Sequence, residues 1–335
     1  MKGFNILVNR KRIVWVDIAK AIAIILMIVG HEIKNVWIST FIFSFHMPLF
    51  FILSGYTSSE VNNSKKLKRN VKKLLKNSWL LAALMILLLT VQQWILYKDV
   101  NIWQDSLKGI FWGSNFYGKD GVQVSNVGVM WFMFAFFWAK IIYDSLQVLL
   151  HSNKYNGFIL GILAYVSIIF SKYYWLPQAL DVAVVAAFFM WCGWYIKKFD
   201  DKNKFNIPLS LSITFFWIMC VLAKIHIELA TRSYPLQFVS VIEAIAGSIV
   251  IIYLSKKCEN LNLLSKLSIL GPHTLAILCI HHLDLYWIWW SKFINSNIIA
   301  AIIRLFIDML LLVIVLWIKK IYKNIFNGNY ELFNK

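Results

Sequence analysis

The chain has 335 residues, of which 60% are hydrophobic and 15% are charged. Soluble domains are about half apolar and a quarter charged, so this composition excludes an ordinary water-soluble fold. The formal net charge of +18 would suit a nucleic-acid-binding protein, but the sequence contains no nucleic-acid-binding module, and we expect no such partner. In a membrane protein this charge is typical of Lys and Arg retained on the cytoplasmic side.

Ten apolar runs are long enough, or nearly so, to cross about 30 Å of hydrocarbon. We therefore predict an all-α integral membrane protein with about ten transmembrane helices in one bundle, in contact with membrane lipids. The fifth run is short, so the count can be off by one there. The runs cover residues 13–30, 36–57, 78–97, 128–149, 157–172, 177–196, 208–226, 236–254, 272–290 and 297–318.

The distribution of Lys and Arg predicts the orientation. With both termini inside, the inner segments hold 23 of the 34 Lys and Arg and the outer loops hold eight. We therefore expect both termini in the cytoplasm, with a transmembrane domain over residues 1–320 and a short cytoplasmic tail over residues 321–335. The densest basic segment, residues 64–76, is either an ordinary inner loop or a docking surface for an anionic cofactor or headgroup.

The cysteines indicate no special chemistry. They are scattered along the chain, with no close pair and no metal-ligand spacing, so we predict neither a disulfide framework nor a metal site. Their positions are Cys192, Cys220, Cys258 and Cys279.

The first apolar run carries polar residues on one helical face. Asp17 and Lys20 are three positions apart and can pair. Lys20 and His31 are separated by eleven positions, which is close to three turns and a rise of about 16 Å. Such a stripe is expected to face the bundle interior or a water-filled cavity rather than lipid. The alternative is a structural Asp-Lys pair that holds helices in register, with His31 as an ordinary interfacial residue.

The second run brings a second histidine to a similar depth. It reads FHMPLFFILSGY from Phe45 to Tyr56 and includes His46 and Ser54. Because the connection to the first run is short, the two helices are expected to be antiparallel neighbours. Ser54 is a weaker candidate as an acyl acceptor, because no Gly-x-Ser-x-Gly elbow surrounds it.

These runs carry a resemblance that extends over most of the chain. A basic residue, ten positions and a histidine (Lys20 to His31), followed by the FHMPLFFILSGY run, resemble the acyltransferase 3 family of membrane-bound O-acyltransferases, in particular its fucose 4-O-acetylase-like branch. The order and spacing of the motifs make the match specific. Three further runs match the same pattern: MWFMFAFFWAK (130–140), LPQALDVAVVAAFFMWCGWYIKK (176–198) and GPHTLAILCIHH (271–282).

The resemblance implies transfer of an acetyl group from acetyl-CoA, as co-substrate, to a hydroxyl of a cell-surface sugar or polysaccharide, either a glycan or a lipid-linked sugar, of the capsule or exopolysaccharide type. It also implies a multi-pass protein of the bacterial plasma membrane with no bound cofactor. His31 is suited to act as general base, because imidazole titrates near neutral pH. Lys20 would stabilise negative charge or bind the donor, and Asp17 would hold Lys20 or orient another group.

Two departures from the family pattern concern basic residues. The common form of the family has arginine at the position of Lys20, and a flexible ammonium does not reproduce a planar guanidinium. The pair Arg69 and Lys72 approximates an Arg-x-x-Arg element and is the candidate donor-binding pair. With the N-terminus inside, the phosphates of acetyl-CoA would stay near these inner basic residues while the thin pantetheine arm threads toward His31.

Other polar residues within the predicted spans are candidates for lining the same cavity. For each alone, a structural contact is at least as plausible as a catalytic task; His226 is expected at the interface, and His151 and His273 are weaker because they lie near span ends. The candidate substrate-binding residues are His46, Ser54, Trp131, Asp181, Glu243, His281 and His282, and further polar candidates are Asp284, Arg304 and Asp308.

Two other functions fit the same intramembrane charges. A transporter or flippase would use them as a proton or substrate path, and a polysaccharide polymerase is also a multispan protein with charged residues in the membrane. The order of the motifs favours acyl transfer over both.

Overall fold

The computed structural model describes residues 12–98, 101–114, 125–150, 153–202, 207–288 and 290–332. Apart from one pair of two-residue strands, the regular elements in these ranges are helices. The long helices are α1 (Val14–Glu32), α2 (Val36–Phe43), α3 (His46–Thr57), α4 (Ser64–Leu74), α5 (Leu80–Tyr97), α6 (Ile102–Trp112), α7 (Trp131–Leu150), α8 (Asn153–Phe170), α9 (Leu180–Asp201), α10 (Ile207–Leu222), α11 (Phe238–Cys258), α13 (Thr274–Leu285) and α14 (Asn297–Leu332).

Short elements connect these helices. The strands β1 (Gly113–Ser114) and β2 (Ser125–Asn126) pair in parallel. The remaining elements are η1 (Leu75–Trp79), a π-helical turn, and η2 (Gly128–Met130), η3 (Pro177–Ala179), α12 (Asn262–Ser265), η4 (Lys266–Ile269), η5 (Gly271–His273) and η6 (Trp290–Lys292).

Eight helical segments of the described chain are long and apolar enough to cross a membrane, which confirms the predicted class of helical membrane protein. Two shorter apolar helices, Lys154–Phe170 and Pro208–Leu222, correspond to the fifth and seventh predicted runs. At 1.5 Å per residue they are about 22 to 26 Å long, slightly less than the hydrocarbon thickness. The count of ten therefore remains a prediction.

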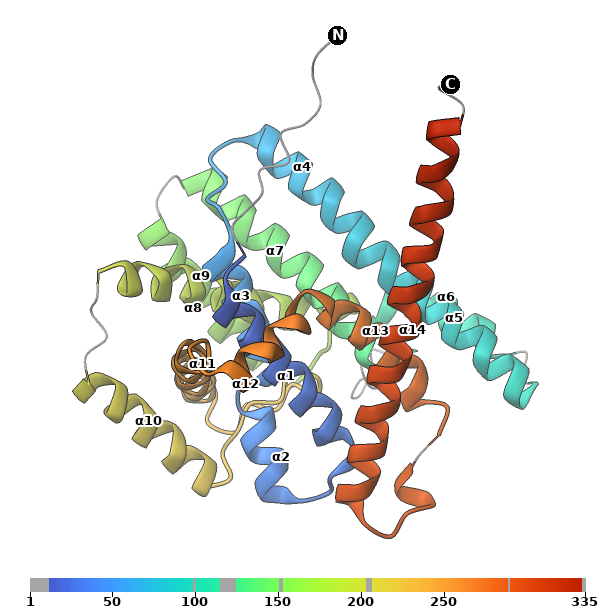
Figure 1. The fold of residues 1–335 in the computed structure, drawn as a ribbon. Helices are drawn as coiled ribbons and strands as arrows, with labels where there is room; N and C mark the ends of the chain where they lie inside the picture. Colours follow the sequence, from blue (N-terminus) through green and yellow to red (C-terminus); the bar gives the residue numbers. More distant parts are fainter. Residues whose placement is uncertain are drawn as a thin grey trace.

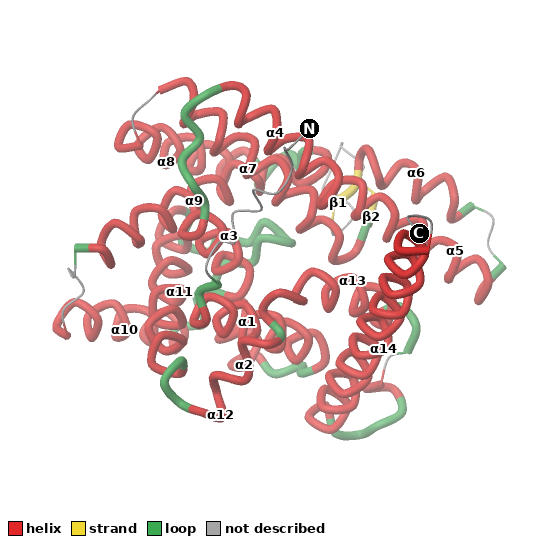
Figure 2. Tube along the Cα trace, turned by 45° about the horizontal axis from the view of Figure 1, so that its top comes forward, coloured by secondary structure: helices red, strands yellow, loops and turns green. Residues whose placement is uncertain are grey.

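The helices form one bundle in which α9 and α1 have the most central positions. Helix α9 packs against α3, α7 and α8, and α1 packs against α3, α11, α13 and α14. Helix α4 and the C-terminal end of α14 extend toward the top of the molecule in Figure 1, whereas α2 lies toward the bottom. Figure 2 shows the same bundle from a tilted direction, with short loops between most helices. Helix α14 continues past Lys320, so the predicted boundary between domain and tail does not coincide with a helix end.

A pair of glycines allows α3 and α9 to pack closely. A Cβ atom on Gly55 would lie 1.8 Å from the carbonyl oxygen of Met190, and one on Gly193 would lie 1.9 Å from the carbonyl oxygen of Ile52. Each helix thus presents a bare backbone segment to the other. Small residues at such contacts let backbones approach closely in membrane proteins.

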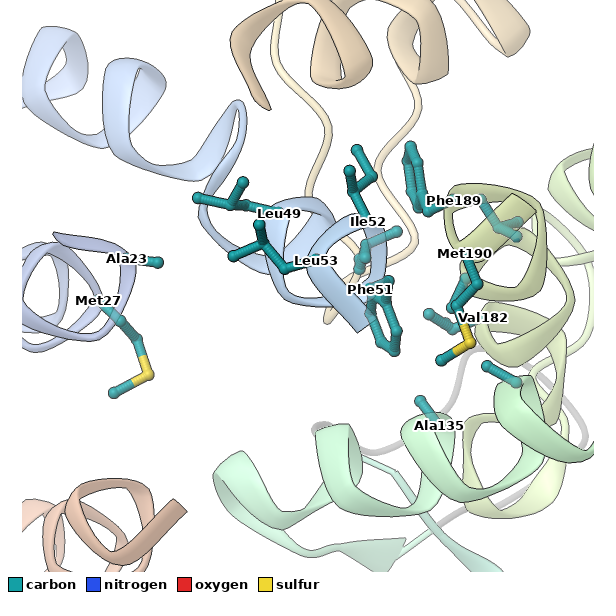
Figure 3. Packing of buried hydrophobic residues seen from close by; sticks show 14 of the residues in the cluster. Ala23, Met27, Leu49, Phe51, Ile52, Leu53, Ala135, Val182, Phe189 and Met190 are labelled. Carbon is teal, nitrogen blue, oxygen red and sulfur yellow. The ribbon is translucent and has the colours of Figure 1, made fainter. Parts of the chain in front are cut away.

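The core lies between α1, α3, α7 and α9. Large apolar side chains from α3 and α9, including Phe51 and Phe189, are fully buried there. Figure 3 shows Leu49, Ile52 and Leu53 extending from α3, and Ala23 and Met27 extending from α1. Since lipid tails are as apolar as these side chains, close packing rather than the hydrophobic effect holds the helices together here.

Two predicted spans are interrupted in ways that the hydropathy pattern does not indicate. The run predicted as one helix over 36–57 is divided at Ser44 and Phe45, where Phe45 has φ −137° and ψ −24°. His46 therefore begins a new helix inside the membrane segment. The run that begins at residue 78 instead continues an earlier helix, because the π-helical turn η1 joins α4 to α5.

Candidate active site

Two neighbouring cavities open along one face of α1. The first, which we call the Lys20 cavity, has a volume of about 280 Å³ and is lined by Lys20, Ile24 and Met27 of this helix. The second, the His31 cavity, has a volume of about 220 Å³ and is lined by Met27 and His31. Steps of three and four residues place all of these side chains on the same side of the helix. The polar stripe predicted from the sequence thus faces the bundle interior.

Lys20 and Asp17 form an ion pair, with Arg12 as a closer partner of the carboxylate. The Lys20 Nζ lies 3.8 Å from Asp17 Oδ1, whereas Arg12 Nε lies 2.5 Å from Asp17 Oδ2. Arg12 also donates to the carbonyl of Ser268 in η4. A Cβ atom on Gly271 would lie 2.3 Å from Asp17 Cβ, so only a glycine at this position lets η5 approach α1 so closely. Asp17 is therefore fixed mainly by Arg12, and Lys20 is left directed at its cavity.

The other polar groups of the Lys20 cavity come from α3, η1 and α13. Ser54 lines it from α3, and Ser78 lines it from the π-helical turn. This turn directly follows the basic helix α4, on which Arg69 and Lys72 are exposed. The basic helix therefore leads into the wall of the Lys20 cavity. Insertions of this π-helical type are frequent at functional sites.

The His31 cavity brings together three of the predicted residues and one that was not predicted. His31, His46 and Trp131 line it from α1, α3 and α7, and Glu228 lines it from the loop between α10 and α11. His46 Nδ1 donates to the carbonyl of Ile42 at 3.1 Å. Because a carbonyl only accepts, His46 Nε2 is the ring nitrogen available to a ligand. Burial raises the pKa of the Glu228 carboxyl above its ordinary value.

A second histidine supports His31 from behind. The rings of His31 and His281 meet edge to face, with centroids 5.3 Å apart. His281 Nδ1 donates to Asp308 Oδ2 at 2.9 Å, and both of these side chains are fully buried. This bond fixes the tautomer and the orientation of the His281 ring. His281 therefore contacts the His31 ring without lining either of the two cavities.

A buried charge network lies next to this histidine pair. Arg304 of α14 is fully buried and donates to Glu32 of α1, and to Asp284 of α13 at 2.6 Å. It also donates to the carbonyl of Ile288 at 2.5 Å. One guanidinium thus joins three helices around the end of α1 that carries His31. Such planar, multiply bonded recognition of carboxylates suits arginine and not lysine.

The loop that carries Glu228 is anchored by a buried ion pair. Arg232 Nε donates to Asp181 Oδ2 at 2.8 Å and Arg232 Nη1 donates to Ser114 Oγ at 2.6 Å. The guanidinium also stacks 4.3 Å from the centre of the Trp175 ring. Asp181 was predicted to bind substrate, but here it holds the loop and lines neither cavity.

The remaining predicted residues that the structure describes are not among those that line the two cavities. Glu243 of α11 and His282 of α13 are fully buried and are not among the lining residues. His273 ends η5, and His226 lies in the loop before α11. His151 lies outside the described residues.

Three charged residues of the candidate site were not singled out from the sequence. Arg12 and Glu32 stand at the two ends of the first run, where charges are ordinary, and Glu228 stands in a short loop with no motif around it. Only the spatial neighbours of these residues give them a role. The loop position of Glu228 was the one available signal, because loops held by a rigid scaffold often carry binding residues.

Comparison with known protein families matches residues 13–319 to the acyltransferase 3 family, described as an acyltransferase domain. The chain belongs to this family. The match extends from the start of α1 into α14, so both cavities lie within the family's domain. No curated protein and no solved structure matched the chain.

Membership of the family confirms that the protein is an acyltransferase. Together with the long apolar helices, family membership shows that the protein is a membrane acyltransferase.

Proposed function

We propose that the protein transfers an acetyl group from acetyl-CoA to a hydroxyl of a cell-surface sugar or polysaccharide, with His31 as general base. The observation that carries the proposal is that Lys20 and His31 of one helix each open into a cavity, and the two cavities share part of their lining. A donor in the Lys20 cavity and an acceptor in the His31 cavity can meet where the two cavities adjoin. The family match favours transfer over a transporter or flippase.

The donor would enter from the side of the molecule that carries the basic helix α4. Acetyl-CoA carries phosphates, whose entry into hydrocarbon is costly. The exposed basic residues of α4, including Arg69 and Lys72, offer a place for these phosphates outside the apolar region. The thin pantetheine arm then follows the Lys20 cavity, where Lys20 binds polar groups of the arm or the developing charge.

The acceptor would bind in the His31 cavity. Its hydroxyl oxygen attacks the thioester carbonyl, so a C–O bond forms and the C–S bond breaks. His31 takes the hydroxyl proton and returns it to the departing CoA sulfur, which leaves as a thiol. His281 with Asp308 would orient the His31 ring, and His46, Trp131 and Glu228 would contact the acceptor.

The topology predicted from the sequence agrees with transfer across the membrane. Both termini in the cytoplasm and ten spans would put Lys20 toward the cytoplasm, where acetyl-CoA is, and His31 toward the outer face. The acceptor would then be a glycan or lipid-linked sugar at the bacterial plasma membrane. The fucose 4-O-acetylase-like motifs of the sequence favour a sugar acceptor.

The test is turnover of radiolabelled acetyl-CoA by the purified full chain in detergent. We expect CoA release by the wild type and a loss of about 100-fold or more in His31→Ala, the range of general base catalysis. His226→Ala is the matched control, because this histidine lines neither cavity. If the wild type leaves acetyl-CoA intact yet moves a solute across vesicles, transfer is wrong and transport replaces it.

A further inference from the structure

Three residues line both cavities and thus form their junction. They are Met27 of α1, Met47 of α3 and Leu278 of α13. Met27 and Leu278 are buried, and Met47 is half-buried. Figure 3 shows the Met27 side chain extending from α1, on the same helix as Ala23. The junction is therefore apolar on three sides.

The junction lies about one helical turn from His31 on α1 and from His281, which contacts the His31 ring, on α13. On α1, Met27 precedes His31 by four residues, a rise of about 6 Å, and follows Lys20 by seven. On α13, Leu278 precedes His281 by three residues. A thioester that enters past Lys20 and reaches His31 therefore has its carbonyl beside these three side chains.

The end of the donor that reaches the junction is the acyl group, because it forms the tip of the pantetheine arm. With the carbonyl held near His31, each added methylene must occupy space beside the junction or in the cavity of about 220 Å³ that the acceptor also needs. Well-packed apolar side chains resist such added volume. A longer acyl group would therefore compete for space with these three side chains and with the acceptor.

We propose that Met27, Met47 and Leu278 form an acyl-length filter, which admits the acetyl thioester and excludes longer acyl chains from the His31 cavity. This rests on the donor path of the proposed function. It also assigns to these residues a role that their sequence does not indicate, since Met and Leu in an apolar run resemble ordinary packing.

The test compares CoA release from acetyl-, propionyl-, butyryl- and octanoyl-CoA by the purified full chain. In hydrophobic pockets one methylene changes specificity by about 10-fold to 200-fold. We therefore expect the wild type to favour acetyl-CoA over butyryl-CoA by at least that range. Leu278→Ala and Met27→Ala are expected to reduce the preference about tenfold or more, mainly through faster turnover of butyryl-CoA.

Met133→Ala is the matched control. Met133 is a buried methionine that lines the Lys20 cavity without reaching the His31 cavity. This change is expected to alter turnover of all four thioesters by a similar factor and to keep their ratio. Met47→Ala provides a second test at a half-buried position, should the buried variants fail to elute as single folded species.

The outcomes separate the filter from the proposed function. If the wild type turns over acetyl-CoA but all junction variants keep its chain-length profile, the filter is wrong and the proposed function stands. A shift of equal size in Met133→Ala also contradicts the filter. If the wild type uses none of the four thioesters, the proposed function fails and the filter fails with it.

Discussion

The histidine cluster at the end of α1 combines one accessible ring with one buried ring. His31 opens into its cavity, whereas His281 is enclosed and bonded to Asp308 at 2.9 Å. A buried carboxylate that holds an imidazole in one tautomer is a common way to orient a catalytic ring. Under the proposed function, Asp308 would influence the reaction through His281 and His31.

Asp308→Asn tests this positioning role. The amide keeps the size of the side chain but loses the negative charge that holds His281, so we expect kcat to fall roughly tenfold or more. The pH dependence of kcat should change as well, while the KM for acetyl-CoA stays close to that of the wild type. Steady-state kinetics between pH 5 and 9 measure all three quantities.

Asp144→Asn is the control for this variant. Asp144 is equally buried and accepts from Lys140 and Asn70, away from the histidines. We expect Asp144→Asn to lower the stability of the protein without changing the pH dependence of kcat. If both variants change the profile alike, Asp308 has only a structural role.

Glu228 gives a separate prediction on pH and stability. Burial raises its pKa in the folded protein above the ordinary value of 4.5. As the pH rises past 4.5, the unfolded chain releases this proton before the folded protein does, so the wild type loses stability until the folded pKa is passed. Glu228→Gln has no such proton to release.

We therefore expect the two proteins to respond differently to pH in thermal unfolding in detergent. The stability of Glu228→Gln relative to the wild type should increase between about pH 4 and the folded pKa of Glu228, and then remain constant. A difference that is the same at every pH would show that the carboxyl titrates alike in both states.

At the scale of the elements, the sequence predicts where helices occur better than where they break. Apolar runs indicated the helices that are apolar enough to span a membrane, because hydrophobicity and length determine which segments do so. They did not indicate helix α4, which lies in the basic segment expected to be an inner loop or a docking surface. The break before His46 and the π-helical turn at Leu75–Trp79 depend on packing between helices, which hydropathy does not report. Both interruptions supply residues to the cavities, which is why the site was predicted only in part.

The contact between α3 and α9 yields a prediction of stability. Gly193→Ala would place a Cβ atom against the backbone of Ile52 and force the helices apart. Overpacking of this kind typically costs about 1–3 kcal/mol. Thermal unfolding of the purified protein measures the loss.

Gly161→Ala is the corresponding control. Its Cβ atom would lie 3.5 Å from Phe188, an ordinary contact, within helix α8. Because alanine favours a helix by up to about 1 kcal/mol over glycine, this variant should be as stable as the wild type or more so. Equal destabilisation of both variants would contradict a specific close approach of α3 and α9.

At the scale of the whole molecule, the long-range pairs were the least predictable part. Glu32 and Arg304 are 272 positions apart and meet only because α14 packs against α1. The packing of α13 against α14 likewise brings Asp284 to Arg304 and His281 to Asp308. In contrast, the Lys20 to His31 stripe was recognisable because both residues lie on one helix, whose geometry is fixed by its period.

The predicted orientation is testable by labelling of single cysteines. Lys34 is exposed after α1, and Lys73 is exposed on α4. In a protein whose four native cysteines are replaced by serine, Lys34→Cys should react with an impermeant maleimide from outside intact cells. Lys73→Cys should react only after the membrane is permeabilised.

The opposite labelling pattern would reverse the orientation. Lys20 would then face outward and acetyl-CoA could not reach it from the cytoplasm. Reaction of both cysteines from outside would place α4 on the same side as the end of α1, and would contradict the proposed path between the two cavities.

The central claim is that an acetyl group passes from a cytoplasmic donor, through the Lys20 cavity, to an acceptor at His31. Radiolabelled acetyl-CoA added to inverted membrane vesicles from the native host tests it directly, because the cytoplasmic face is then outside. The account predicts labelled, base-labile acetyl esters on glycan inside wild-type vesicles and at least about 100-fold less label with His31→Ala. Equal labelling in both, or label confined to the outer face of the vesicles, would contradict it.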